Sequence, residues 1–405
     1  MSEQVESSKS FTASPKPYWR VDVAVHIVFV LAGVVTTVLG PLIPLLVVHR
    51  VISGFQAGYL FTAQFLGSLA GVGLTSLLLA HFGFRRPLEV GFFLMGAGVA
   101  ALWFCSWPEM LWCVASYGVG LGLVIPSSNL FIAEIHWPRP APALNTLNFA
   151  WELGAVVSSL WVGALVAMDA VGPGLAGLGI LIAVLPILTP LGQLPAQRTT
   201  PSCPTRLGTR QKKTKVVVSL AIGLLFYLYV GIETSLGGWV ATFAQQVARQ
   251  GHRAWILAPG FFWGALLFGR ALAPILLRRI NDQTLMLAEL PVAAFGIALL
   301  LTAQSVGGIL AAAMVAGIGL ATVYPGTISL LSLHSGVAAR RSGGPMFALS
   351  ALGGASLPWL VGYIAARTEK FQFGLAIPLA GVLAMWIVFI VIARVSTAGG
   401  HFRKT

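Results

Sequence analysis

Apolar residues run through this chain in long stretches, and short polar segments separate them. Each stretch holds about 20 residues or more, the length that an α-helix needs to cross the hydrocarbon core of a bilayer. The pattern therefore predicts an all-α membrane protein with twelve transmembrane helices. They are expected near residues 22–48, 56–82, 87–105, 109–135, 141–168, 172–193, 216–247, 254–278, 284–303, 307–333, 342–367 and 372–395.

The polar segments divide the predicted helices into two groups of six. Residues 197–215, rich in Thr, Pro, Arg and Lys, form the one internal connection long enough to join two separate bundles. We therefore expect an amino-terminal bundle at 21–196 and a carboxy-terminal bundle at 216–396, with polar tails at 1–20 and 397–405. The first tail lacks the apolar core of a signal peptide, so we interpret it as a retained segment.

The second half of the sequence repeats the first at an almost constant offset. Residues 71–81 match residues 269–279 at an offset of 198, and residues 118–126 match 317–325 at an offset of 199. Two further matches fall in the same order, 33–38 with 231–236 and 154–163 with 353–362. Parallel half-repeats of this kind are typical of alternating-access transporters. They predict two pseudo-symmetric six-helix bundles with a solute site between them.

Composition and charge agree with a membrane protein and indicate its orientation. Of all residues, 57% are hydrophobic and 9% are charged, against about 25% charged in a typical soluble domain. If the amino terminus is cytoplasmic, nineteen of the 25 Lys and Arg residues fall on the cytoplasmic side and five on the other. The positive-inside rule then places both termini and the central segment in the cytoplasm. We expect a multi-pass protein of the bacterial inner membrane.

Metal, cofactor and nucleic-acid chemistry are not expected. The three cysteines offer no disulfide framework, and the seven histidines are scattered without an i, i+4 pair. No Walker loop is present, so ATP is not expected to drive the protein. The basic central segment is interpreted as a topology signal, with lipid headgroups as an alternative contact, because no folded element presents its charge to nucleic acid.

Glu233 is the first candidate for a functional residue. Inserting a charged side chain into the hydrocarbon core of a membrane costs about 2.5–3.5 kcal/mol, so a charge in this place indicates a functional role. It lies near the middle of the seventh predicted helix, with Tyr229 and Gly237 one turn away on the same face. A carboxyl in this place can take up a proton, because desolvation favours its neutral form. It can also accept a hydrogen bond from a sugar hydroxyl, or form a structural pair with a neighbouring helix.

Glu152 and Arg270 form the second candidate. Asn145, Asn148 and Glu152 make one polar stripe on the fifth predicted helix, and Arg270 lies at a similar depth on the eighth. In a two-bundle transporter these two helices face each other. Glu152 and Arg270 are therefore expected to pair, either as a gate that closes the cytoplasmic side and parts when that side opens, or as a permanent bridge.

Further polar and aromatic residues are candidates for contact with a solute. Asn129 lies in the fourth predicted helix, where an amide usually forms a hydrogen bond across a helix interface. The cavity is expected to be lined by Tyr229, Trp239, Trp263 and Tyr324 as solute contacts, with Trp239 stacked on a sugar ring. Glu89 and Glu289 are instead expected to latch helices near the Arg85–Arg86 and Arg278–Arg279 pairs.

The whole chain resembles the major facilitator superfamily. Its loop at residues 79–86 resembles a degraded form of that superfamily's Gly-…-Asp-Arg-x-Gly-Arg-Arg signature, with Ala80 and His81 at the Asp-Arg positions. Stretches within 129–155 and 229–270 resemble the branch that contains fucose permeases and related sugar symporters. The resemblance implies a sugar-like solute, proton coupling and a monomer. The first helix lacks the carboxylate that a fucose permease uses, so a coupled mechanism here requires Glu233 or Glu152.

Three classes of function follow from these features. The first is a secondary transporter of a small polar solute, sugar-like by resemblance and proton-coupled. It would move the solute by rocking residues 1–196 against 216–405. The second is an exporter of amphipathic compounds, or an uncoupled facilitator, with the same architecture. The third is a membrane-embedded enzyme or a scaffold, and an enzyme is not expected because no cluster of acid–base or metal-binding groups is present.

Overall fold

The computed structural model describes residues 19–50, 52–136, 141–188, 209–248, 253–335 and 339–398. Across these ranges the regular secondary structure is entirely helical. The first half holds α1 (Trp19–Thr37), α2 (Leu39–Arg50), α3 (Gly54–Phe82), α4 (Arg85–Leu102), α5 (Met110–Ile135), α6 (Ala141–Ala167) and α7 (Val171–Leu188). The second half holds α8 (Thr209–Val247), the 3-10 helix η2 (Ala254–Leu257), α9 (Ala258–Leu276), α10 (Asp282–Thr302), α11 (Val306–Leu320), α12 (Val323–Ser335), α13 (Ala339–Thr368) and α14 (Phe371–Ala398).

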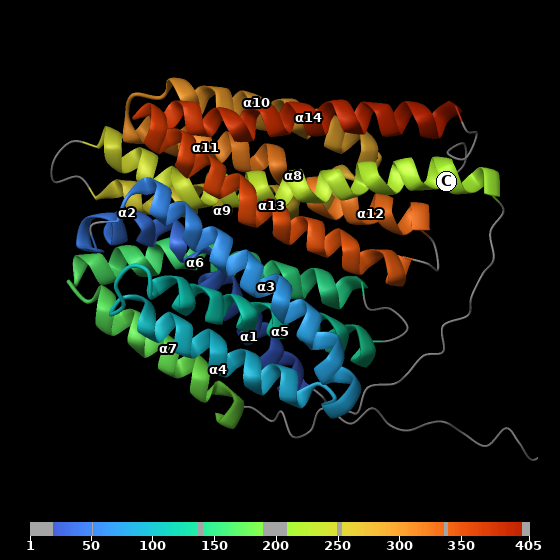
Figure 1. Cartoon of the computed structure of the whole chain (residues 1–405). Coiled ribbons are helices and arrows are strands. Elements are labelled where there is room, and N and C mark those ends of the chain that lie inside the picture. Colours follow the sequence, from blue (N-terminus) through green and yellow to red (C-terminus); the bar gives the residue numbers. More distant parts are fainter. Residues whose placement is uncertain are drawn as a thin grey trace, which may run out of the picture.

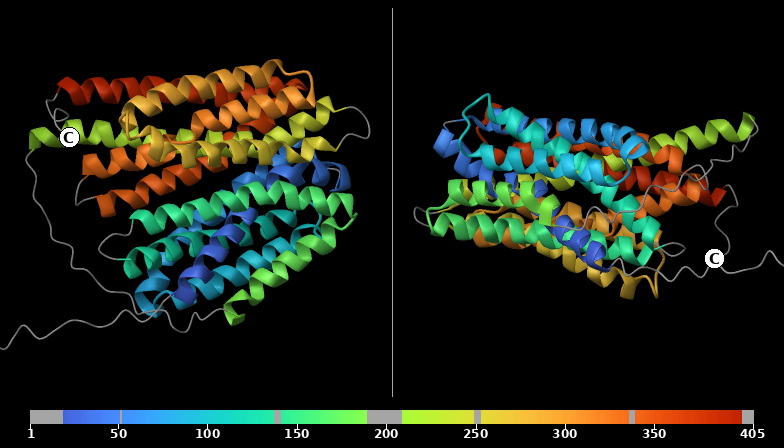
Figure 2. Two further views of the ribbon diagram at one scale, coloured as in Figure 1. Left: turned by 180° about the vertical axis from the view of Figure 1, so that it is seen from behind. Right: turned by 90° about the horizontal axis from the view of Figure 1, so that it is seen from below.

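These helices form two bundles that lie side by side with their long axes in one general direction (Figures 1 and 2). Ten helical segments of the described chain are long and apolar enough to cross a membrane, and α2 and α7 are shorter apolar helices. Each of the twelve expected ranges is occupied by one helix or by two consecutive helices. The predicted fold class, an all-α membrane protein of two six-helix bundles, is confirmed.

Two of the expected helices are interrupted where a proline follows one turn later. The first is divided into α1 and α2 at Val38, and the tenth into α11 and α12 at Ala321 and Thr322. Proline has no N–H, so Pro41 and Pro325 leave the carbonyl groups four residues earlier without their helical donor. The helices that contain Pro126 and Pro358 continue without interruption.

The seventh transmembrane helix is longer than the apolar pattern predicts. It begins at Thr209, whereas the polar connection was expected to extend to residue 215. Residues 210–215 are Arg, Gln, Lys and Thr, without Gly or Pro, and most of them are good helix formers. They therefore extend the helix beyond its apolar part, giving 39 residues in all.

Close backbone contacts between small residues hold each bundle together, and they follow the sequence repeat. A Cβ atom at Gly71 of α3 would lie 2.9 Å from the Cα of Gly122 of α5, and the same holds in reverse. In the second half, Gly269 of α9 lies against the side chain of Ala321 in the equivalent place. Small residues permit this close approach of helix axes in membranes. The sequence repeat therefore corresponds to the same helix–helix contact in both bundles.

The two bundles meet at one end and diverge toward the other. We call the end that carries the last turn of α7 and the first turn of α8 the linker end, and the opposite end the far end. At the far end, Thr62 Oγ1 donates to the Ala355 carbonyl at 2.8 Å, and the Phe61 and Trp239 rings lie 5.7 Å apart. From there α3 and α13 separate toward the linker end (Figure 1). The structure is thus closed at the far end.

Candidate functional site

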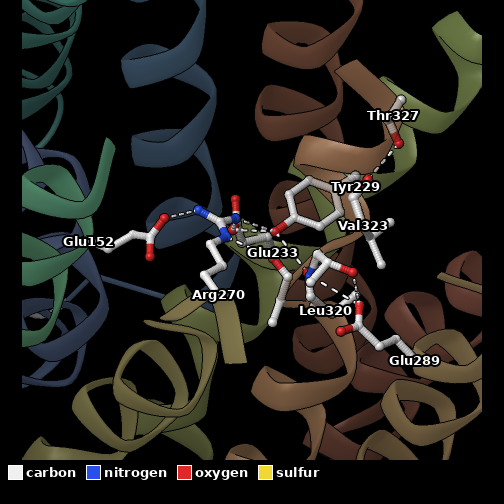
Figure 3. A network of polar contacts seen from close by, with 10 residues as sticks. Glu152, Tyr229, Glu233, Arg270, Glu289, Leu320, Val323 and Thr327 are labelled. Carbon is white, nitrogen blue, oxygen red and sulfur yellow. Dashed lines mark hydrogen bonds and ion pairs between the residues drawn. The ribbon is translucent and has the colours of Figure 1, made fainter. Parts of the chain in front are cut away.

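The buried charges of three helices meet between the bundles (Figure 3). Glu152 of α6 and Glu233 of α8 are 2% and 9% exposed. Arg270 of α9 binds Glu152 Oε1 through Nη1, and its Nη2 lies 3.5 Å from Glu233 Oε1. One guanidinium therefore serves two carboxylates, one from each bundle.

Tyr229 completes this cluster one helical turn before Glu233. Its hydroxyl donates to Glu233 Oε1 at 2.7 Å and accepts from Arg270 Nη2 at 2.9 Å. The Leu320 carbonyl lies 3.3 Å from the same hydroxyl and is a second acceptor for its proton. The i, i+4 spacing of Tyr229 and Glu233 on one face of α8 is what allows the contact.

The break between α11 and α12 forms the wall of the cluster. Pro325 leaves the Ala321 carbonyl without its helical donor, and Arg270 Nε donates to this oxygen at 2.8 Å. On the other side of the break, Glu289 Oε2 of α10 accepts from the Thr322 N–H at 3.0 Å and from Thr322 Oγ1 at 2.5 Å. Polar groups at an interrupted membrane helix need such partners, because the hydrocarbon supplies none.

The two carboxylates that were expected to latch helices, Glu89 and Glu289, have different kinds of partner in the structure. Glu89 pairs with Arg85 at 2.7 Å and with Arg86 at 3.0 Å, but both arginines belong to its own helix α4, so these ion pairs do not join neighbouring helices. Glu289 does not follow the expectation that it would lie with Arg278 and Arg279, because its carboxylate binds Thr322 at the break. The break exposes a backbone N–H within reach of α10, and an apolar pattern gives no sign of it.

The asparagines predicted to contact the solute lie apart from the charge cluster. Asn145 and Asn148 are exposed on α6, on the linker-end side of Glu152. Asn129 is half-buried on α5, and its Nδ2 donates to the Ile125 carbonyl of its own helix at 3.0 Å. Their contact with a solute stays a prediction.

The aromatic candidates differ in their surroundings. The Tyr324 ring lies 5.3 Å from that of Tyr229, beside the cluster, and the Trp263 ring packs edge-on against Trp151 at 5.7 Å. Trp263 Nε1 is buried without a hydrogen-bond partner in the described part of the chain. Trp239 is fully buried, and its Nε1 donates to the Pro358 carbonyl at 2.8 Å. In this conformation Trp239 therefore packs the far-end interface.

The Glu152–Arg270 pair is formed although the bundles diverge toward the linker end. The role of the pair, as a gate or as a permanent bridge, stays a prediction. Glu152 Oε2 remains buried without a hydrogen-bond partner among the described residues. The bridge thus leaves one carboxylate oxygen free for a proton or for a hydroxyl group.

Sequence reasoning identified the charged members of the cluster but missed Thr322 and the role of Glu289. The signal that was available is Pro325, which marks Ala321 as a carbonyl in need of a donor. In the part of the chain that the structure describes, no group of three or more His, Cys, Asp or Glu residues is arranged to hold a metal ion.

A multi-pass protein of two related six-helix bundles, with its buried charges at their interface, has the architecture of an alternating-access transporter. The chain belongs to the Major Facilitator Superfamily, whose sequence pattern matches residues 25–343. It is accordingly a membrane transporter and not an enzyme.

Curated relatives and solved structures agree with this family. The chain is 23% identical to the sodium-dependent glucose transporter 1 of Danio rerio, over 95% of this chain and 70% of that protein. It is 25% identical to a glucose/galactose transporter of Brucella abortus, over 87% of this chain and 90% of that protein. Among solved structures it resembles a bacterial homologue of the lysosomal transporter Spinster in an inward-facing state, with a TM-score of 0.75, 14% identity and coverage of 94% and 98% of the two chains. It also resembles the Escherichia coli fucose:proton symporter, with a TM-score of 0.62, 15% identity and coverage of 93% and 99%.

Proposed function

We propose that this protein is a proton-coupled secondary transporter of a small, hydroxyl-rich solute of the sugar class. The amino-terminal bundle (21–196) rocks against the carboxy-terminal bundle (216–396), and the solute binds between them. The charge cluster of Glu152, Glu233 and Arg270 couples the proton to this motion. The proposed solute contacts are Asn129, Asn145, Asn148, Tyr229, Trp239, Trp263 and Tyr324.

The observation that carries the coupling is the charge balance of the cluster. Two buried carboxylates share one guanidinium, so the cluster holds one unmatched negative charge when both carboxyls are ionised. An unmatched charge in a low-dielectric interior is costly, and one proton removes it. Glu233 is the proposed proton carrier, because its contact with Arg270 is the longer one and a protonated Glu233 can donate to the Tyr229 oxygen. The Tyr229 proton then turns to the Leu320 carbonyl, 3.3 Å away.

The sugar class is supported by the relatives and by the polar groups that the cluster leaves unused. The relatives from Danio rerio and Brucella abortus are both named for hexose transport. Glu152 Oε2 is an unused acceptor and Trp263 Nε1 an unused donor, which is the complement that a hydroxyl group offers. The name of the first relative makes Na⁺ an alternative coupling ion, and an exporter or an uncoupled facilitator has the same architecture.

We further propose that the linker end faces the cytoplasm of a bacterial cell and that the protein works as a monomer. The asymmetry of Lys and Arg supports this orientation. The state described above would then be inward-facing, which agrees with its likeness to the inward-facing Spinster homologue.

The test is the transient current of proteoliposomes on a capacitive membrane, challenged with hexoses, pentoses and polyols, for wild type and Glu233→Gln. A sugar-evoked current in Na⁺-free buffer that is lost in the variant supports proton coupling at Glu233. A current that requires Na⁺ contradicts it, and a proton current that survives the substitution moves the coupling to Glu152.

The matched control is Glu109→Gln, the same change on an exposed carboxylate outside the cluster, and it should keep the wild-type current. If no sugar evokes a current, counterflow of radiolabelled sugar separates an uncoupled sugar facilitator from an exporter of amphipathic compounds, since the exporter does not exchange sugar.

A further inference from the structure

The two halves of the protein treat equivalent prolines in different ways. In the first half, Pro126 leaves the Gly122 carbonyl without its helical donor, and Thr75 Oγ1 of α3 donates to it at 3.0 Å. In the second half, Pro325 leaves the Ala321 carbonyl free, and Arg270 Nε of α9 donates to it at 2.8 Å. Both donors come from the second transmembrane segment of their half, but one is neutral and the other carries a charge.

The helix itself also differs between the halves. The helix α5 runs through Pro126 without interruption, whereas α11 ends at Leu320 and α12 begins at Val323. The Ala321 N–H donates to the Ile318 carbonyl at 3.2 Å. In a continuous α-helix this carbonyl would accept from the Thr322 N–H, which donates to Glu289 instead. At the offsets of 199 and 198 residues that relate the two halves, the positions equivalent to Glu289 are Val90 and Gly91, neither of which carries a charge. A proline in this position therefore requires neither a helix break nor a charged partner.

The Ala321 carbonyl and the Thr322 N–H belong to a single peptide group. A trans peptide is planar, with its C=O and N–H pointing in opposite directions. Arg270 binds one edge of this plane and Glu289 binds the other (Figure 3). The carboxylate and the guanidinium polarise the peptide in the same sense, so each hydrogen bond strengthens the other.

We propose that Glu289 is a positioning residue for Arg270, acting through the peptide group between Ala321 and Thr322. Glu289 fixes the plane of this peptide, and the fixed carbonyl holds Arg270 Nε. With Nε held, Nη1 is directed to Glu152 of the opposite bundle and Nη2 to Tyr229. A continuous polar path thus runs from α10, on the outside of the carboxy-terminal bundle (Figure 1), to the interface between the bundles. This inference concerns the bridge between the bundles and does not depend on which solute or ion is transported.

The alternative is that Glu289 only caps the amino end of α12. A carboxylate near a helix amino terminus stabilises the helix by itself, because it satisfies an N–H and opposes the helix dipole. Loss of a cap would destabilise the protein to the same extent whether or not Glu152 is present. Loss of a positioning residue would matter only while Arg270 has Glu152 to bind. The two roles are therefore separated by a double-mutant cycle.

The experiment measures the unfolding equilibrium constant of purified full-length protein in detergent for wild type, Glu289→Met, Glu152→Gln and the double variant. We expect Glu289→Met to raise this constant about tenfold more in the wild-type background than in the Glu152→Gln background, as for residues coupled within one network. Glu289→Gln should lie near wild type, because its side-chain carbonyl still accepts from Thr322. Equal effects of Glu289→Met in both backgrounds overturn the proposal.

Two further variants keep the test decisive. Asn281→Ala removes the side chain that caps α10 by accepting from the Thr284 N–H at 2.8 Å, and its effect should be the same in both backgrounds. If Glu289→Met does not fold, Thr322→Val replaces it in the cycle, since it removes one of the two hydrogen bonds to Glu289 and keeps the N–H. Additive behaviour of Thr322→Val with Glu152→Gln likewise overturns the proposal.

Discussion

Arg270 binds Glu152 across the interface while the bundles on which the two residues lie diverge toward the linker end. The pair thus links α6 and α9 across the interface in this conformation. Its partners Glu233 and Tyr229 lie on the Arg270 side of the interface. In the proposed mechanism, a proton taken up at Glu233 changes the charge beside this pair without first breaking it.

The two carboxylates of the cluster should respond differently to the same substitution. Glu152→Gln removes the ionic partner from the opposite bundle, and we expect it to lower the free energy of unfolding by about 1–3 kcal/mol. Glu233→Gln removes the unmatched charge and keeps the bridge, so it should leave stability unchanged or raise it. Thermal unfolding of both variants in detergent checks this. A loss of stability for Glu233→Gln equal to that for Glu152→Gln would contradict the charge balance described above.

A side chain at Gly40 should force the far end open. A Cβ atom there would overlap the Gly237 carbonyl of α8 in the opposite bundle, and overpacking of this kind costs about 1–3 kcal/mol. We expect Gly40→Ala to shift the protein away from the far-end-closed state. Maleimide labelling of Ala355→Cys, at a position now 5% exposed, should increase severalfold in a background whose native cysteines are replaced by Ser.

The control for this prediction is Gly73→Ala. A Cβ atom at Gly73 of α3 meets nothing within 4 Å, so the same substitution should leave the labelling unchanged. An increase for both variants would trace the effect to helix propensity and not to the contact between the bundles.

Substitution of Trp239 by Phe should lower the free energy of unfolding less than substitution by Ala. Phe keeps the ring between Phe61 and Phe371 but loses the hydrogen bond to the Pro358 carbonyl, at a cost of about 1 kcal/mol. Ala also leaves a cavity and should cost about 3–5 kcal/mol. Thermal unfolding measures both, with Trp112→Phe at a side chain that is 78% exposed as the neutral control. A stable Trp239→Ala variant with weakened sugar binding would instead favour the predicted stacking role.

The orientation can be tested with two single cysteines. Gln304 is exposed in the turn between α10 and α11 at the far end, and Ile280 is 36% exposed between α9 and α10 at the linker end. With the linker end in the cytoplasm, a membrane-impermeant maleimide should label Gln304→Cys in intact cells and Ile280→Cys only after permeabilisation. The reverse pattern would invert the proposed topology.

The helical spans and their division into two bundles could be predicted from sequence, because both depend on local composition. A bilayer requires about 20 apolar residues per helix wherever the helix lies, so the pattern alone locates the spans. The packing repeat was equally readable, since Gly71 and Gly269 occupy matching places in the two halves. The rarity of charge in apolar helices also singled out Glu152, Glu233 and Arg270.

Sequence by itself determined which residues are costly in the membrane, and tertiary structure decided what each of them binds. Pro325 predicts a free carbonyl at Ala321, but only the arrangement of the helices decides that Arg270 reaches it. Glu289 was expected near Arg278 and Arg279, and the break at Thr322 gave it a backbone partner instead. The reason is physical. Hydropathy indicates whether a segment lies in lipid or in water, whereas a hydrogen bond depends on how helices that are distant in sequence are rotated and where they are interrupted.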